Sequence, residues 1–304
     1  MSAAGRACPM RYRYGAAAIA RAPLKSVETL YVIGGLYGNL PALNAIEAMC
    51  EREQQAVTLC FNGDFNWFNV DDVGFRAINE RVLRHDAILG NVEAELQAAA
   101  DAVGCGCAYP DEVDSGIVER SNRIHARLKQ TAAHHPDLLA GLDRLPMVAR
   151  YVVGSVRVGV VHGDADTLAG WRFDTSLTQD ITNDAWLQQA FAQAEVDVFA
   201  STHTCLPVLR DYATHAVINN GSAGMPNYSG THYGLLTRIS TQSAPGETIG
   251  GVRIRDVHID ALPIHFDVPR WLHMFDSNWP RDSDAWISYN ERIRNGPSHP
   301  LPAR

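Results

Sequence analysis

Strands and helices alternate over the first part of the chain, and this order limits the fold more than any other feature of the sequence. Residues 29–33 form a short apolar run rich in β-formers, and apolar residues at helical spacing follow over 41–53. The order repeats, with a predicted strand over 57–61, a helix over 73–83 and a short strand over 87–89. Such a βαβαβ order predicts a largely parallel sheet, with its loops gathered at the carboxyl ends of the strands.

The part of the chain after residue 146 predicts a second sheet. Two β-branched runs, over 147–153 and 156–161, are joined by Gly154 and Ser155, which is typical of a hairpin. A helix is predicted over 184–194. Further strands are predicted over 196–200, 208–210, 216–218, 233–239 and 252–258. Strands therefore dominate this half of the chain.

The chain is expected to hold one large domain with a segment added at each end. Residues 28–262 form the domain, and a mostly helical stretch over 92–146 is predicted to be an insertion or lid within it. The stretch 1–27 contains five basic side chains and no acid, so we expect a loosely ordered arm, with a targeting segment as the less favoured alternative. Three tryptophans and several prolines over 263–304 predict a packed C-terminal extension rather than a linker.

Composition and charge limit the kinds of partner and the cellular compartment that we expect for the chain. The net charge of -8 comes without a basic stripe, which disfavours a nucleic-acid surface. No apolar run approaches the roughly 20 residues that a membrane-spanning helix needs, so we expect no membrane segment. The six cysteines are spaced irregularly, which favours reduced thiols and a cytoplasmic protein. Cys105 and Cys107 lack the second cysteine pair of a zinc site, so they are expected to be ordinary thiols in a loop.

Polar loops follow five of the predicted strands, and each offers a side chain that can bind a metal ion or a phosphate group. A single loop of this kind carries little weight, because an Asp or Asn after a strand is commonly a turn former or a helix cap, and an isolated His is commonly a core group. Five together at the ends of strands favour a functional site. The loops span residues 34–39, 62–64, 90–93, 161–164 and 201–203, and a glycine-containing loop over 219–226 follows them.

The order and spacing of these loops over residues 29–239 resemble the calcineurin-like metallophosphoesterases, especially their small bacterial phosphodiesterase branch. The resemblance implies an α/β fold in which two mixed sheets and flanking helices form a four-layer αββα sandwich. It places the site between the sheets, at the edge that carries the loops. It also implies hydrolysis of a phosphomonoester or a phosphodiester by water that metal ions activate.

Four residues match metal ligands of that family. Asp64 matches the carboxylate that bridges the family's two metals. Asn91 and His162 match ligands of the second metal, and His203 matches a ligand of the first. The resemblance therefore implies a site in which these four side chains meet.

Three other ligand positions of the family are changed here. Gly35 stands where the family has an Asp, Tyr37 where it has a His, and Ser201 where it has another His. Gly35 offers no ligand, and a phenol with a reference pKa of about 10 is a poor replacement for imidazole at neutral pH. Tyr37 can still donate a hydrogen bond to a phosphate group. Val92 stands where many relatives have a catalytic His, which the bacterial branch often lacks as well.

We therefore expect one divalent transition metal per chain, Mn, Fe or Zn, rather than two. Its predicted ligands are Asp64, Asn91, His162 and His203. The predicted catalytic residues are Asp64, His203 and Tyr37. A small phosphorylated substrate is the expected partner. The rival hypothesis is an impaired pseudoenzyme that binds a phosphorylated ligand or a protein without turnover.

Neighbouring segments are expected to complete the site. Glu93, Asp164 and Asp166 could each add a carboxylate from an adjacent loop. The segment 104–110 and the helix over 117–131 are predicted to lie over the site and shape substrate choice, because loops on a rigid scaffold often carry function. The alternative is a helical pair packed away from the site.

Overall fold

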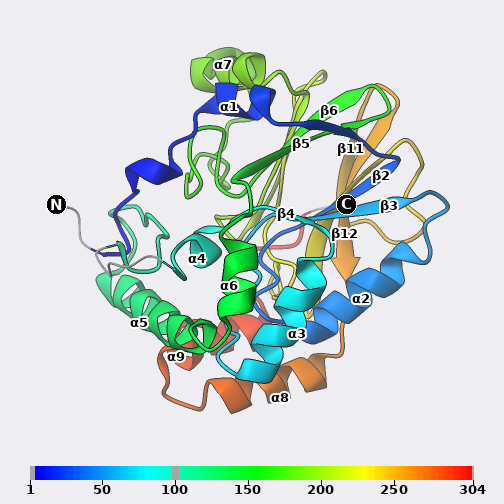
Figure 1. Cartoon of the computed structure of the whole chain (residues 1–304). Helices are drawn as coiled ribbons and strands as arrows, with labels where there is room; N and C mark the ends of the chain where they lie inside the picture. The colour runs from blue at the N-terminus through cyan, green and yellow to red at the C-terminus, as the bar shows by residue number, and fades with distance from the viewer. Residues whose placement is uncertain (1–3, 98–102, 303–304) are drawn as a thin grey trace.

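Two six-stranded sheets form the centre of the molecule in the computed structural model, which describes residues 4–97 and 103–302 (Figure 1). The first sheet has the spatial order β11-β12-β10-β2-β3-β4, and the second has the order β1-β5-β6-β7-β9-β8. Each sheet contains both parallel and antiparallel neighbours. Residues 1–3, 303–304 and residues 98–102 of the predicted insertion lie outside the described residues.

The strands that precede the polar loops run parallel to one another within each sheet. In spatial order, the strands of the first sheet are Gly250–Ile254, Val257–Ile264, Gly234–Ser240, Thr29–Ile33, Val57–Phe61 and Asp86–Ala87. Those of the second sheet are Leu24–Ser26, Val148–Val153, Val156–Val161, Val198–Ser201, Ala216–Asn220 and Pro207–Asp211. Because β2, β3 and β4 are parallel, as are β6 and β7, their carboxyl ends share one edge of each sheet.

The alternation of side chains along the strands explains why the two sheets stack. Tyr31 and Ile33 of β2 pack beneath helices, whereas Leu30 and Val32 of the same strand face the second sheet. Such alternation is expected of a strand that is apolar on both faces. The layer between the sheets is a cluster of buried aliphatic side chains from both of them.

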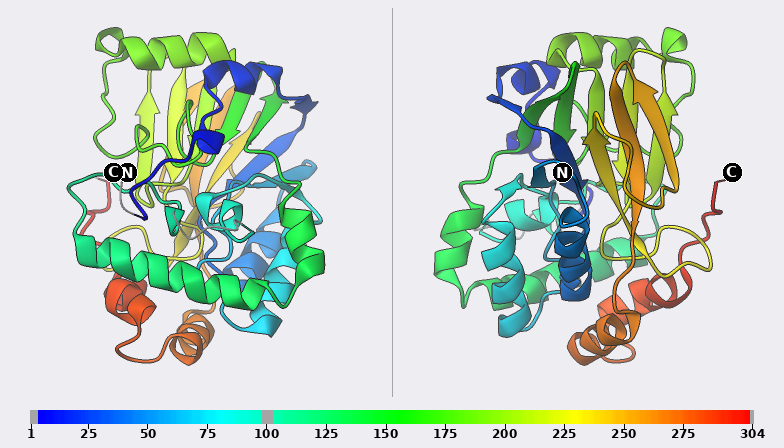
Figure 2. Two further views of the ribbon diagram at one scale, coloured as in Figure 1. Left: turned by 60° about the vertical axis from the view of Figure 1, so that its left-hand side comes forward. Right: turned by 90° about the vertical axis from the view of Figure 1, so that its right-hand side faces the viewer.

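Helices cover the outer face of each sheet (Figures 1 and 2). On the side of the first sheet lie α2 (Leu40–Cys50), α3 (Asp72–Val82) and α5 (Ser115–Ala132). On the side of the second sheet lie α1 (Ala16–Arg21) and α7 (Ala185–Ala194). This arrangement confirms the predicted four-layer αββα sandwich of two mixed sheets.

The described part of the N-terminal stretch belongs to the sandwich, so the expectation of a loosely ordered arm is wrong. β1 pairs with β5 at the edge of the second sheet, and α1 packs against α7. Tyr12, in the short 3-10 helix Met10–Tyr12, is fully buried, and its hydroxyl donates to Glu95. The expectation relied on the basic side chains, whereas the buried Tyr12, Ala16 and Ile19 decide where the segment packs.

The predicted single strand over 252–258 is also wrong, because the structure has a hairpin there. β11 and β12 run antiparallel and join at Arg255, which adopts a φ of 55°. No glycine marks this turn, so the usual sequence signal of a hairpin is missing. The predicted hairpin over 147–161 is confirmed by β5 and β6.

Further helices lie in the expected insertion, directly before α7 and at the C-terminal end. They are α4 (Asn91–Ala94), α6 (Pro136–Leu142), the 3-10 helix Ile181–Asn183, α8 (Val268–Asn278) and α9 (Asp284–Asn295). α9 lies beside α5, and Trp271 and Trp279 of the C-terminal segment are buried against the core. No helix among the described residues has both the length and the apolar character needed to cross a membrane.

Candidate metal centre

Four polar side chains meet where the loops of the two sheets face each other. Asp64 follows β3 and Asn91 begins α4, both at the edge of the first sheet. His162 follows β6 and His203 follows β7 in the second sheet. One atom from each of Asp64, His162 and His203 lies within 4.8 Å of the others, and all three residues are buried. The structure thus brings the predicted ligands together, while their role as ligands stays a prediction.

The ring of His162 directs a lone pair toward the centre of this cluster. Nδ1 of His162 lies 2.8 Å from the carbonyl oxygen of Asn62, which can only accept, so Nδ1 carries the proton. Burial lowers the pKa of His162 to about 4, so the ring is neutral at pH 7 and Nε2 is unprotonated. Nε2 is the atom that faces the other three side chains.

The ring of His203 is oriented in the same way by a different carbonyl group. Its Nε2 lies 3.1 Å from the carbonyl oxygen of Cys107 and therefore carries the proton, which leaves the lone pair on Nδ1. Burial, together with the neighbouring His162, lowers the pKa of His203 to about 3. Nδ1 of the neutral His203 lies 3.1 Å from Nε2 of His162. Neither nitrogen carries a proton, so no hydrogen bond joins them.

The amide of Asn91 and the carboxylate of Asp64 complete the cluster. Nδ2 of Asn91 donates to the carbonyl oxygen of Cys105 at 2.9 Å, so Oδ1 points toward Nε2 of His162, 3.0 Å away. Oδ1 of Asp64 lies 3.3 Å from the same nitrogen and accepts a hydrogen bond from the backbone N–H of Val92. Burial raises the pKa of Asp64 because the charged carboxylate loses its contact with water.

A divalent cation fits these four acceptor atoms. A proton on Asp64 could satisfy one lone pair of His162, but it would leave Asn91 Oδ1 and His203 Nδ1 without a donor. A cation at the centre would satisfy all four atoms and would also favour the charged form of Asp64. Two imidazole nitrogens with one amide and one carboxylate oxygen suit Mn, Fe or Zn. The donor set therefore agrees with the predicted metal class.

Glu93 supports the cluster from behind, a role that the sequence reasoning missed. Its Oε2 accepts the backbone N–H of Asp64 at 2.8 Å, and its Oε1 accepts from Phe65 N at 3.1 Å and Asn66 Nδ2 at 3.2 Å. These contacts hold Asp64 at a φ of 55°, a conformation that an aspartate rarely adopts. Burial and the nearby charge of Asp64 raise the pKa of Glu93. Its position three residues after Gly90 was the only signal in the sequence.

The three carboxylates that could have added a ligand are all engaged elsewhere. Both oxygens of Glu93 accept from the Asp64 loop, as described above. Asp164 accepts from the backbone N–H groups of Asp166, Thr167 and Arg172 and so stabilises its own loop. Asp166 accepts from the indole N–H of Trp186. None of the three belongs to the cluster.

Tyr37 fills the space next to Gly35, where the family pattern has an aspartate. Gly35 has a φ of 63°, and a Cβ atom built there would lie 2.9 Å from Cε2 and 3.1 Å from the hydroxyl oxygen of Tyr37. The Tyr37 hydroxyl pairs with the sulfur of Cys205 at 2.8 Å instead of joining the metal ligands. Burial raises the pKa of Tyr37, which keeps the phenol neutral at physiological pH. The changes at positions 35 and 37 are therefore spatially linked.

Ser201 is the third changed position, and its hydroxyl group makes no hydrogen bond to the described residues. Its Oγ is buried and has no hydrogen-bond partner among the described residues. A neutral hydroxyl is a weaker ligand for a transition metal than imidazole. The ligand set thus remains a group of four, with Asp64, Asn91, His162 and His203.

A small, mostly aromatic cavity covers the cluster. Its volume is about 50 Å³, which holds a few water molecules but no phosphoester. None of the described residues that line it is a Lys or an Arg. The lining residues are Tyr37, Asp64, Trp67, Asn91, Val92, Cys107, Tyr109, Trp171, His203, Cys205 and Tyr289.

Part of the predicted lid forms one wall of this cavity. Cys107 and Tyr109 belong to the segment 104–110 and line the cavity together with Asp64. α5 lies behind this wall, where the hydroxyl groups of Ser121 and Tyr109 are 3.0 Å apart. Arg123 of the same helix pairs with Asp284 and does not line the cavity. The effect of this segment on substrate choice stays a prediction.

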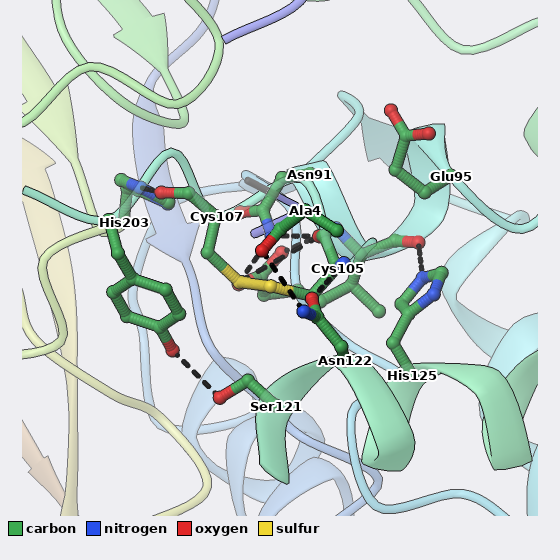
Figure 3. The surroundings of a disulfide bond; sticks show 12 residues. Ala4, Asn91, Glu95, Cys105, Cys107, Ser121, Asn122, His125 and His203 are labelled. Atoms are coloured by element: carbon green, nitrogen blue, oxygen red, sulfur yellow. Dashed lines mark hydrogen bonds between the residues drawn. A yellow bond between two sulfur atoms is a disulfide. The ribbon is translucent and has the colours of Figure 1, made fainter. Parts of the chain in front are cut away.

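The expectation of two ordinary thiols at Cys105 and Cys107 is wrong, because the structure joins them in a disulfide (Figure 3). Gly106, between them, has a φ of 69°, which turns the chain back so that the two Cα atoms lie 5.4 Å apart. This separation is within the range of a disulfide. A Cys-Gly-Cys spacing alone does not reveal this turn.

Comparisons with known proteins bear on the fold. In sequence, the chain matches no family model and no curated protein. Among solved structures, a metallophosphoesterase from Sphaerobacter thermophilus has a TM-score of 0.56 at 14% identity, covering 89% of this chain and 100% of that one. A hypothetical protein from Pyrococcus horikoshii OT3 has a TM-score of 0.61 at 12% identity, covering 89% of this chain and 99% of that one. At these identities the likeness concerns the fold, and the chain therefore has the metallophosphoesterase fold that its loop order predicts.

Proposed function

We propose that this protein is a phosphoester hydrolase that uses one divalent cation, Mn, Fe or Zn, held by Asp64, Asn91, His162 and His203. The observation that supports this proposal is the convergence of four acceptor atoms. The N–H groups of the side chains that carry them all point away from the common centre. The N–H groups of both rings and of the amide are held by carbonyl groups, so each lone pair faces the common centre. Such orientation by outer hydrogen bonds is typical of metal sites.

Each residue of the centre has a definite part in the proposed reaction. A bound cation supplies Lewis-acid activation of the phosphoester and of the water that attacks it. Asp64 contributes the only negative charge among the four ligands, and both imidazoles remain neutral ligands at pH 7. Tyr37 keeps its proton and donates to a phosphoryl oxygen once its hydroxyl leaves the sulfur of Cys205.

The proposed substrate is a small phosphorylated molecule. The cavity volume of about 50 Å³ is too small to enclose a whole phosphoester, so part of the substrate would extend outward past Tyr109 and Tyr289, which line the cavity. The acidic net charge of -8 fits a small substrate better than a nucleic acid. A cytoplasmic location stays a prediction.

One observation supports the rival function, a pseudoenzyme that binds a phosphorylated ligand or a protein. Tyr37 occupies the space beside Gly35, so a second cation lacks both a carboxylate and room for one. A two-metal mechanism uses both ions to stabilise the attacking and the leaving oxygen atoms. The two functions therefore differ in whether a single cation supports turnover.

Metal content and turnover of the whole chain test the proposal. After purification without chelator, elemental analysis should find about one transition metal per chain, as three or four protein ligands can hold. Asp64→Ala should abolish both the bound metal and the hydrolysis of a generic phosphodiester or phosphomonoester. Asp166→Asn, a change of a carboxylate outside the cluster, should leave both unchanged. Two tightly bound ions per chain, or metal retained by Asp64→Ala, would contradict the proposed centre.

A further inference from the structure

The segment that contains the disulfide also orients two of the four proposed ligands (Figure 3). The carbonyl oxygen of Cys105 accepts from Asn91 Nδ2 at 2.9 Å, and that of Cys107 accepts from His203 Nε2 at 3.1 Å. Cys107 also accepts the indole N–H of Trp171 at 3.1 Å. The two carbonyl groups therefore decide where the Asn91 oxygen and the His203 lone pair point.

The disulfide fixes these two carbonyl groups relative to each other. It closes a small ring that contains only Gly106 between the two cysteines. Gly106 has a φ of 69°, and a Cβ atom built there would lie 2.4 Å from the Tyr12 hydroxyl, so the ring is held closely on that side. On the other side, the N–H of Cys105 donates to Oδ1 of Asn122 in α5 at 3.0 Å. Without the sulfur–sulfur bond, a glycine at this position regains much of its backbone freedom.

We propose that Cys105 and Cys107 form a reversible redox modification site that controls the affinity of the metal centre, an inference that rests on the proposed function. A small dithiol reduces the pair: the sulfur–sulfur bond breaks, one S–H forms on each cysteine, and the dithiol leaves as its own cyclic disulfide. In the reverse step, a low-molecular-weight disulfide takes up the two electrons and two protons and leaves as two thiols. Attack occurs by thiol–disulfide exchange at an accessible sulfur atom.

Access to the sulfur atoms runs through the cavity over the metal centre. Cys107 lines this cavity, whereas Cys105 is fully buried. A reductant therefore approaches the disulfide from the same cavity as the substrate of the proposed reaction. A bound cation, which the oriented ligands stabilise, should in turn disfavour the reduced form at equilibrium, because binding and oxidation favour the same loop arrangement.

Manganese affinity in the two redox forms tests this inference on the whole chain. Loss of an outer hydrogen bond to a metal ligand typically lowers metal affinity about 10- to 100-fold, so we expect the Kd for Mn²⁺ to rise about 10-fold on reduction. The protein is reduced with a phosphine, which is removed without air, and the Kd is measured by the paramagnetic resonance signal of free Mn²⁺. Thiol titration should find two more free thiols in the reduced form, and oxidised glutathione should restore the first Kd.

Two variants separate the disulfide from general effects of cysteine chemistry. The double variant Cys105→Ser, Cys107→Ser should bind Mn²⁺ at the weaker level under both conditions. Cys50→Ser, at a cysteine of α2 that does not line the cavity, should respond to reduction as the natural protein does. Comparison of the two redox forms of the natural chain needs no variant to fold.

Each remaining outcome would overturn the inference. Equal Mn²⁺ affinity in the two forms would overturn it and leave the proposed function intact. Tighter binding in the reduced form would do the same, since it would make a free thiol of Cys107 a ligand. A pair that stays reduced in oxidised glutathione would remove the modification site itself. No Mn²⁺ binding in either form would overturn the proposed function together with this inference.

Discussion

The two halves of the candidate site differ in how far they keep the family pattern. The ligand half, Asp64, Asn91, His162 and His203, has every polar proton directed away from the centre. In the filled half, Gly35, Tyr37 and Ser201, a phenol ring occupies the space of an absent side chain. The contrast supports the proposal that the chain keeps one of the family's two cation positions and fills the other with protein atoms.

Removal of the Glu93 carboxylate should have the largest effect on the ligand half. Glu93→Ala leaves the donors at Asp64 N, Phe65 N and Asn66 Nδ2 without their carboxylate, so it should lower the free energy of unfolding by about 3–5 kcal/mol. Urea denaturation measures this change. Mn²⁺ binding should weaken as well, because the Asp64 loop loses its support.

Two further variants control the Glu93 experiment. Glu93→Gln retains one acceptor oxygen and should cost clearly less than the alanine variant. Glu112→Ala, at an exposed glutamate, should change the free energy of unfolding by no more than about 0.5 kcal/mol. A Glu93→Ala protein as stable as the natural one would mean that the Asp64 loop keeps its conformation by other contacts.

A carboxylate restored at position 35 should show whether the filled half is closed by Tyr37. Gly35→Asp alone places a side chain against the Tyr37 ring and at a left-handed φ, which should cost about 2–4 kcal/mol of folding stability. Adding Tyr37→His should recover much of this loss, a coupling that a double-mutant cycle in urea measures. Strictly additive costs would mean that the two positions do not share space.

Restoration of all three positions sharpens the comparison between enzyme and pseudoenzyme. Gly35→Asp, Tyr37→His and Ser201→His together should add a second Mn²⁺ per chain and raise hydrolysis of a generic phosphodiester. That result would indicate that the natural filled half differs from a working metal site only in its three missing ligands. If the natural chain already hydrolyses a phosphoester and the triple variant is slower, then the site has been rebuilt around one cation.

The affinity of the ligand half for metal should depend on pH through Asp64. Both histidines, with pKa values of about 4 and 3, stay unprotonated above pH 5, so they contribute little competition there. The pKa of Asp64 is raised by burial, so protons compete with the cation below that raised value. The Kd for Mn²⁺ should therefore rise by up to about 10-fold per pH unit as the pH falls toward 5. A Kd independent of pH between 5 and 8 would contradict this assignment.

The same histidines predict a pH effect on folding in the absence of metal. Their folded-state pKa values are lower than the unfolded value, so their contribution to stability is present above about pH 6.5 and is lost as the pH falls toward 4. Asp64 and Glu93, with raised pKa values, act in the opposite direction. Urea denaturation of His203→Gln across this range should show a smaller loss of stability on acidification than the natural protein shows.

Tyr37→Phe should have the smallest effect and tests the phenol alone. The variant loses the contact with Cys205 and little volume, so the free energy of unfolding should fall by about 1 kcal/mol. If the phenol donates to the phosphoryl group, turnover should fall by at least about 5-fold. Tyr109→Phe, which removes a hydroxyl bonded to Ser121 in the same cavity, is the matched control. Equal turnover in the natural protein and Tyr37→Phe would remove Tyr37 from the catalytic residues.

The fold could be predicted because its signals are local and repeated. Apolar runs that end in polar loops located β2, β3, β6 and β7, and loop order placed them in one architecture. The hairpin of β11 and β12 escaped prediction because Arg255 adopts a left-handed φ without a glycine signal. The N-terminal strand β1 escaped because its place depends on pairing with β5, far along the chain.

The sequence could predict which residues form the candidate site, but not how their side chains are oriented. Asp64, Asn91, His162 and His203 could be named because each lies in a loop after a strand and matches a ligand position of the family that the loop order resembles. The inward direction of their lone pairs depends on the carbonyl groups of Asn62, Cys105 and Cys107, which no side-chain pattern encodes. The contact between Tyr37 and the space beside Gly35 likewise depends on the positive φ angles of Gly35 and Tyr37.

The aromatic cover over the cluster has a consequence for the lifetime of a bound ion. Tyr109 and Tyr289 line the cavity beside Asp64 and His203, and each of these two proposed ligands is only 6% exposed. A cation that leaves the proposed centre would pass these aromatic side chains, so its residence time should depend on how they pack as well as on the strength of the bonds at the centre.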